Sequence, residues 1–91
     1  MAKRSKLEII KDILKIIQES RNSVKPTPLL RRSNISSKRF KEYFDELLAK
    51  NLIEESYTKN GKVISMTEKG QRFLEKYRAI IEFIDEFELG A

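Results

Sequence analysis

The chain has 91 residues, of which 36% are charged and 40% hydrophobic, and it contains no Cys, His or Trp. A chain of this length can build one hydrophobic core but not two, so we expect a single domain. We also expect no cofactor. The missing residue types exclude disulfides, zinc sites built on thiolates or imidazoles, and the Ser-His and Cys-His pairs of nucleophilic catalysis. We expect no signal peptide and no membrane-spanning segment, because no apolar run approaches the roughly 20 residues that a bilayer requires.

The net charge of +5 is distributed unevenly along the chain. Residues 1–41 contain 12 Lys and Arg against 3 Asp and Glu, whereas residues 42–91 contain 7 against 11. A basic half favours a polyanionic partner, and an acidic half avoids the same partner. The sequence thus predicts a molecule with one end that binds polyanions and one end that does not.

The first predicted element is a helix from about Ser5 to Ser20. Ser5 and Glu8 have the spacing of a capping box at its start. An apolar stripe at helical spacing indicates which side faces the core. It consists of Leu7, Ile10, Ile13, Leu14 and Ile17. After a polar turn, Val24-Lys25 has room only for a very short strand.

Two helices joined by a tight turn are predicted next. Thr27 is expected to cap the first, from Pro28 to about Ser33, since Pro is favoured at the first helical position. Ser36 is expected to cap the second, over residues 37–50. The core face of that second helix carries Phe40, Tyr43, Phe44, Leu47 and Leu48. Such a pair is typical of a helix-turn-helix.

A hairpin and a long helix complete the predicted order. The strands Leu52–Tyr57 and Lys62–Met66 flank Asn60-Gly61, which predicts a type I′ turn with positive φ at both residues. Thr67 is expected to cap a last helix that runs to about Leu89. The apolar residues of this helix recur at heptad spacing over about two heptads. This order of elements predicts a winged helix-turn-helix of the α+β class, mostly α, with the hairpin as its wing.

Three segments, taken in order, resemble a known family. They are Thr27 to Ser36, the third-helix pattern from Phe40 through Asn51-Leu52-Ile53-Glu54, and Met66-Thr67-Glu68-Lys69-Gly70 with Phe73-Leu74 and Tyr77. The set resembles the small archaeal winged-helix DNA-binding proteins that pair through a long C-terminal helix. At the position before the Leu-Ile strand, where that family usually has Gly, this chain has Asn51, which tolerates the same left-handed conformation.

The resemblance implies both an architecture and a function. The architecture has a basic arm in residues 1–5, a winged helix-turn-helix in 6–67 and a dimerisation helix in 68–91 that forms an antiparallel coiled coil with a second copy. The function is non-catalytic binding of double-stranded DNA as a homodimer. The role would be that of a transcriptional regulator or a chromosomal protein, in the cytoplasm and associated with the nucleoid.

The candidate DNA-binding residues are basic or hydroxyl side chains near the predicted helix-turn-helix, wing and arm. In a helix-turn-helix, the start of the second helix meets the base edges in the major groove. Arg pairs bidentately with guanine, whereas Lys and Ser contact phosphate or base edges. The alternative is an ordinary solvated basic face. The candidates are Ser36, Ser37, Lys38, Arg39, Lys41, Arg31, Arg32, Lys59, Lys62, Lys3 and Arg4.

The candidate dimerisation residues lie in the last helix, where apolar side chains exceed what so small a domain can cover. They are Tyr77, Ile80, Ile81, Phe83, Ile84 and Phe87. The alternative is that this helix folds over the first helix of the same chain and uses Ile9 and Ile16.

There are two alternatives to DNA binding: an enzyme that acts on nucleic acid and a module that binds proteins. An enzyme acting on nucleic acid would need clustered carboxylates for Mg²⁺, and Asp45 and Glu46 have no evident convergent partner. A winged-helix module that binds acidic proteins, without direct DNA contact, remains the open alternative because a basic surface suits both partners.

Overall fold

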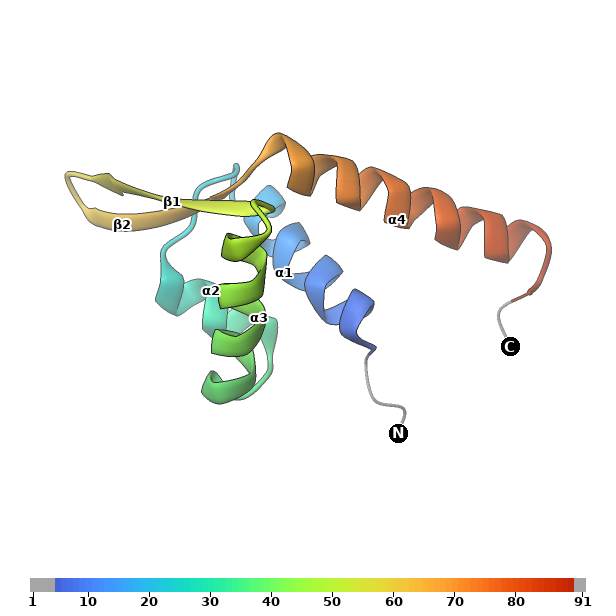
Figure 1. The fold of residues 1–91 in the computed structure, drawn as a ribbon, viewed down its shortest axis with the longest axis horizontal. Helices are drawn as coiled ribbons and strands as arrows, with labels where there is room; N and C mark the ends of the chain where they lie inside the picture. The colour runs from blue at the N-terminus through green and yellow to red at the C-terminus, as the bar shows by residue number, and fades with distance from the viewer. Residues whose placement is uncertain (1–4, 90–91) are drawn as a thin grey trace.

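The computed structural model describes residues 5–89. Three helices, a two-stranded antiparallel sheet and a last helix follow one another in the predicted order (Figure 1). The helices are α1 (Lys6–Glu19), α2 (Pro26–Ser33), α3 (Ser37–Ala49) and α4 (Glu68–Glu86), and the strands are β1 (Ile53–Thr58) and β2 (Gly61–Met66). This confirms a mostly helical winged helix-turn-helix with a long C-terminal helix. We call α1 to α3 the head. The hairpin and α4 extend from the head in opposite directions (Figure 1).

Helix α1 is the centre of the core. Its capping box is confirmed, because Ser5 Oγ accepts from Glu8 N at 3.1 Å and Ser5 N donates to Glu8 Oε1 at 3.1 Å. Six of its side chains are buried, which means that neighbours cover it on more than one side. They are Ile9, Ile10, Ile13, Leu14, Ile16 and Ile17. Leu7, predicted to belong to the same stripe, is 54% exposed because the first turn of α1 lies where α4 diverges from it (Figure 1).

The link between α1 and α2 is fixed to the base of the hairpin. Asn22, with φ 59°, pairs its side-chain amide with the backbone of Met66, as a neighbouring strand would. Its Oδ1 accepts from Met66 N at 2.7 Å and its Nδ2 donates to Met66 O at 3.3 Å. Val24 forms a single antiparallel bridge with Ile64. The short strand predicted at Val24-Lys25 is thus one bridge long.

Helix α2 begins earlier than predicted. It starts at Pro26, with Lys25 at the N-cap and no side-chain cap hydrogen bond, so the cap at Thr27 and the start at Pro28 are wrong. The first of the two prolines already has a helical φ and no N–H to satisfy, so it takes the first helical position. Asn34 ends the helix in the left-handed region.

The turn of the hairpin also differs from the prediction. The register joins Thr58 to Gly61 and leaves Lys59 and Asn60 in the loop. Gly61 has φ 109°, but Asn60 does not have a positive φ, so a type I′ turn centred on Asn60-Gly61 is wrong. The Thr58 hydroxyl accepts from Asn60 N at 3.1 Å and donates to Gly61 O at 3.2 Å, which holds the loop in another way.

Helix α4 begins as predicted but ends three residues early. Thr67 Oγ1 accepts from Gly70 N at 3.2 Å, which confirms the cap. The helix ends at Glu86 instead of Leu89, because Glu88 turns into the left-handed region and Leu89 N donates back to Ile84 O at 3.0 Å. None of the described helices is long and apolar enough to cross a membrane.

Candidate nucleic-acid interface

The N-terminal half of α3 presents the exposed residues Ser36, Ser37, Lys38, Arg39 and Lys41. The opposite side of the helix is held in the core by buried and half-buried side chains, including Phe40 and Phe44, whose rings stack at 5.5 Å. Ser36 Oγ accepts from Arg39 N at 3.2 Å and thereby caps the helix. The sequence folds this way because apolar residues at helical spacing alternate with charged ones.

The cations on α3 fall into two groups. Among residues 5–89, no carboxylate lies within ion-pair distance of Lys38 or Arg39. Lys41 Nζ, in contrast, lies 3.1 Å from Asp45 Oδ2, one turn along the same helix. The two unpaired cations both lie on the first turn of α3.

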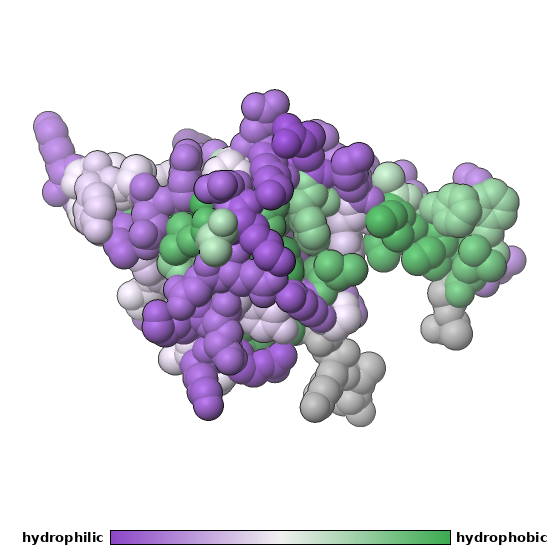
Figure 2. Space-filling view, in the orientation of Figure 1, coloured by the Kyte–Doolittle hydropathy of each residue, from purple (hydrophilic) through white to green (hydrophobic). Residues whose placement is uncertain are grey.

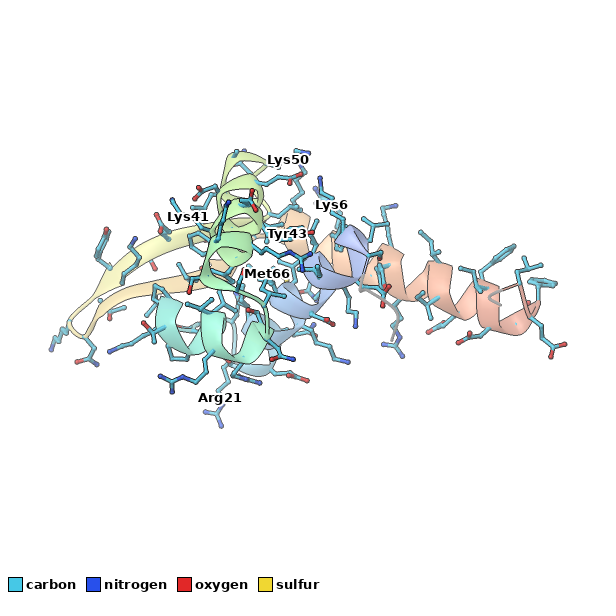
Figure 3. The ribbon with its side chains drawn as sticks, turned by 90° about the horizontal axis from the view of Figure 1, so that it is seen from below. Lys6, Arg21, Lys41, Tyr43, Lys50 and Met66 are labelled. Atoms are coloured by element: carbon cyan, nitrogen blue, oxygen red, sulfur yellow. The ribbon has the colours of Figure 1, made fainter. Side chains whose placement is uncertain are left out.

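The end of α2 shows the same division. Arg31 is exposed and has no ion pair within the described chain. The guanidinium of Arg32 donates to Ser20 Oγ at 3.1 Å and lies 3.4 Å from Glu19 Oε1, both at the end of α1. Arg21, which the sequence analysis did not single out, is a further exposed cation next to this group and points away from the body of the protein (Figure 3).

The wing carries two cations and an exposed aromatic ring. Lys59 is exposed in the loop. Lys62 Nζ lies 2.9 Å from Glu55 Oε2 on the other strand, and the hydrogen bond to Glu55 raises the pKa of Lys62. Tyr57, directly opposite Lys62 in the register, is 77% exposed. Lys3 and Arg4 lie outside the described residues.

The C-terminal end of α3 is tied down by other elements. Glu46 Oε2 lies 2.9 Å from Lys6 Nζ of α1 and 3.0 Å from Lys50 Nζ (Figure 3), and these two hydrogen bonds lower the pKa of Glu46. Two residues at the start of α4, one of them its N-cap, also donate to the carbonyls of the two residues that follow α3. Lys69 Nζ donates to Lys50 O at 2.9 Å, and Thr67 Oγ1 donates to Asn51 O at 2.6 Å. Helix α3 is therefore anchored at one end and open at the other.

Apolar side chains lie uncovered on the far end of α4 (Figure 2). Ile80, Ile81, Phe83 and Phe87 are exposed, whereas Tyr77 and Ile84 are half-buried. The alternative in which this helix covers α1 accounts for only part of its apolar surface. Phe73 and Leu74 pack on the core, but Ile80, Phe83 and Phe87 remain more than half exposed.

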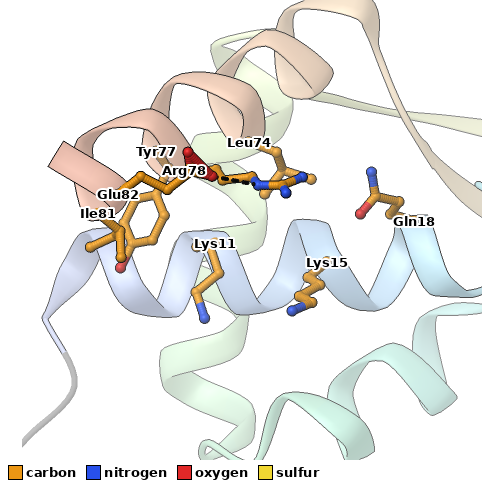
Figure 4. Close-up of a pocket in the computed structure, with 8 residues that line it drawn as sticks. All are labelled: Lys11, Lys15, Gln18, Leu74, Tyr77, Arg78, Ile81 and Glu82. Atoms are coloured by element: carbon orange, nitrogen blue, oxygen red, sulfur yellow. Dashed lines mark hydrogen bonds and ion pairs between the residues drawn. The ribbon is translucent and has the colours of Figure 1, made fainter. Parts of the chain in front are cut away.

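An open groove of about 470 Å³ lies between α1 and α4 (Figure 4). Two of its charged side chains pair with each other, because Arg78 Nε donates to Glu82 Oε1 at 3.0 Å. A third, Lys11, pairs with Asp12 outside the groove, and Lys11 Nζ lies 2.7 Å from the Asp12 carboxylate. Hydrogen bonding to Asp12 raises the pKa of Lys11, whose ammonium also lies 5.9 Å from the centre of the Tyr77 ring. Among residues 5–89, no group of three or more acidic side chains could hold a metal ion.

Comparisons with known proteins agree with this geometry. The crystal structure of Sso10a-2, a DNA-binding protein from Sulfolobus solfataricus, is similar at a TM-score of 0.74 and 20% identity, over 93% of this chain and 86% of that one. F93 from STIV, a winged-helix DNA-binding protein, is similar at a TM-score of 0.73 and 21% identity, over 88% of this chain and 92% of that one. Comparison with curated proteins gave no significant match.

The sequence itself carries a family signature as well as the fold. The family model described as winged helix-turn-helix matches residues 3–85, which include every described helix and strand almost to the end of α4. The chain therefore belongs to the winged helix-turn-helix family.

Proposed function

We propose that the protein binds double-stranded DNA as a homodimer and catalyses no reaction. The observation that carries this proposal is the outward first turn of α3, where Lys38 and Arg39 are exposed and, within the described chain, have no carboxylate partner. The two similar structures are described as DNA-binding proteins, which supports the same partner for this chain.

In the proposed complex, α3 enters the major groove with its N-terminal half. Arg39 offers a planar pair of donors that fits guanine, and Lys38 offers a point charge for phosphate or guanine. Ser36 and Ser37 bring hydroxyl and backbone N–H groups to the same helix start, where the helix dipole favours an anion. Phosphate contacts from Arg31 and from the basic arm, Lys3 and Arg4, would fix the orientation on the duplex.

The wing would lie on the backbone or in the minor groove beside α3. It extends away from the core as a two-stranded ribbon and carries Lys59 in its exposed loop (Figure 1). A contact there adds affinity that does not depend on sequence, because phosphates are the same at every step. We propose Lys59 as the main contact and Lys62, whose ammonium is paired with Glu55, as a weak one.

The second copy would pack along the exposed apolar side of α4. Tyr77, Ile80, Ile84 and Phe87 recur at heptad spacing, and Ile81 and Phe83 flank them. An antiparallel arrangement is favoured by charge, since a parallel one would bring together the acidic ends of both helices. Those ends carry Glu82, Asp85, Glu86 and Glu88.

Either of two roles fits such a dimer: regulation of transcription or organisation of the chromosome. Both roles place the protein at the nucleoid and both require duplex binding first. A measurement of duplex binding therefore tests the step that both roles share.

The test is a titration of labelled duplex DNA with the variant Lys38→Ala/Arg39→Ala. We expect affinity to fall by roughly thirtyfold or more, since a base contact contributes about 1–3 kcal/mol and each phosphate contact adds to it. The matched control is Arg72→Ala/Lys76→Ala, which removes the same charge from exposed positions on α4. Its effect should be within a few-fold of wild type.

Two outcomes would contradict the proposal. Equal losses in both double variants would mean that net charge, and not α3, determines binding. Absence of binding by the wild type at low salt to any duplex would instead favour the protein-interaction module, whose partner would be an acidic protein surface.

A further inference from the structure

Several of the proposed DNA-binding cations already have a carboxylate partner in the folded chain. The pairs are Lys62 with Glu55 at 2.9 Å, Lys41 with Asp45 at 3.1 Å and Arg32 with Glu19 at 3.4 Å. Each pair joins one cation of the candidate interface to an acid on the same or a neighbouring element. The interface therefore contains cations that are ready to bind a phosphate and cations that are occupied.

The pair in the wing is the best defined of the three. Glu55 lies on β1 opposite Ile64, and Lys62 lies two residues before Ile64 on β2, so the two side chains meet diagonally across the strands. The side chains of Lys62 and Glu55 are 37% and 30% exposed, whereas those of Lys41 and Asp45 are 76% and 57% exposed. Less solvent surrounds the wing pair, so the attraction between its charges is screened less.

The wing as a whole has no net charge. Over residues 53–66, Lys59 and Lys62 are balanced by Glu54 and Glu55. A phosphate that approaches Lys62 must displace Glu55, whose freed carboxylate then repels it. Because the pair is neutral, it also releases fewer counterions from DNA than a free lysine would.

We propose that Glu55, together with Asp45 and Glu19, lowers the affinity of the protein for duplex DNA of any sequence by holding cations of the binding face in intramolecular pairs. This inference rests on the proposed DNA-binding function and names the residues that regulate its strength. Weak general attraction leaves the choice of site to the contacts made by the first turn of α3.

The test compares Glu55→Gln with wild type on a labelled duplex of random sequence, between about 50 and 200 mM KCl. At the lower salt we expect affinity to rise by about three- to tenfold, because a lysine is set free and a repelling carboxylate is removed. The slope of log K against log salt should become steeper by about 0.9 for each protomer in contact with DNA. The matched control is Glu82→Gln, which frees Arg78 on α4 and changes the net charge equally.

A second variant tests whether Lys62 binds phosphate while it is still paired with Glu55. Glu55→Gln/Lys62→Gln removes the whole neutral pair and should bind DNA within about twofold of wild type, since little net attraction is lost. A large loss of affinity in this variant would show that Lys62 binds phosphate in spite of Glu55, and would overturn the inference.

The outcomes also distinguish this inference from the function on which it rests. Equal changes in Glu55→Gln and Glu82→Gln, with clear binding by wild type, would overturn the masking role alone. Failure of the wild type and of Glu55→Gln to bind any duplex would overturn both the DNA-binding function and the masking role.

Discussion

Gly70 lies where α4 passes so close to the rest of the protein that a larger side chain would not fit. A Cβ atom at this position would lie 2.3 Å from Leu52 O and 2.6 Å from Met66 Cγ. The first is a backbone atom, which cannot move without shifting the entry to β1. Gly70 therefore allows α4 to begin in direct contact with the end of α3 and the base of the hairpin.

We predict that Gly70→Ala destabilises the protein by about 1–3 kcal/mol, the usual cost of overpacking a core position. The sign is informative, because Ala in a helix interior is otherwise about 1 kcal/mol better than Gly. Urea unfolding followed by circular dichroism measures the change. The control Gln71→Ala, at the exposed neighbouring position, should stay within about 0.5 kcal/mol of wild type. A stabilised Gly70→Ala variant would mean that α4 can move away from Leu52 at little cost.

At the scale of single residues, the sequence predicts what is local and misses what is distant. The caps at Ser5, Ser36 and Thr67 were predicted because each bond joins residues three apart. The side-chain amide of Asn22 forms hydrogen bonds with Met66, 44 residues away, and no sequence pattern predicts that pair. The partner of Arg32 on α1 is hidden in the same way. Which cations are free and which are occupied thus required the structure.

Among the elements, α4 has the most to reveal about assembly. We predict that Ile80→Glu weakens self-association by more than about 100-fold, since each copy loses the burial of an Ile worth about 1.5–3 kcal/mol. Because Ile80 is 58% exposed, the folded chain itself should tolerate the change. Sedimentation at several protein concentrations measures the effect.

The neighbouring residue provides the control for this experiment. Ala79 is also exposed but lies about 100° away from Ile80 around the helix, off the heptad seam. Ala79→Glu adds the same charge and should leave the dimer intact. If Ile80→Glu sediments like wild type, the seam is not the interface. If both variants dissociate, the acidity of α4 and not its apolar side controls assembly.

Element types were predictable from periodicity, but element ends were not. The four helices follow from apolar spacing and caps, and the hairpin follows from Asn60-Gly61 between two short segments of strand type. The core contains the apolar side chains predicted for the first and third helices, apart from Leu7. The ends depend on local competition between neighbouring residues. Pro26 takes the start of α2 ahead of Pro28, and the Thr58 hydroxyl shapes the wing loop that Asn60-Gly61 seemed to specify. Neither competition can be read from residue types alone.

For the whole molecule, the charge distribution predicts how binding responds to salt. If a dimer neutralises about six phosphates, log K should fall with log salt at a slope near −5. The acidic end of α4 should contribute nothing to this slope, because it lies away from the head (Figure 1). Titrations across a range of KCl concentrations measure the slope. An affinity that does not change with salt would exclude phosphate contacts as its source.

The hydrogen bonds from Thr67 and Lys69 to the end of α3 have a consequence for the kind of site that such a dimer can use. They connect the end of α3, the helix proposed to read the major groove, directly to the start of α4. Two copies paired along α4 would hold their reading helices at one distance and one relative rotation. Because the grooves of B-DNA recur about every 10.5 base pairs, the protein would respond to the helical phase between two half-sites and not merely to their separation. Its affinity would then rise and fall with half-site spacing at the period of the DNA helix.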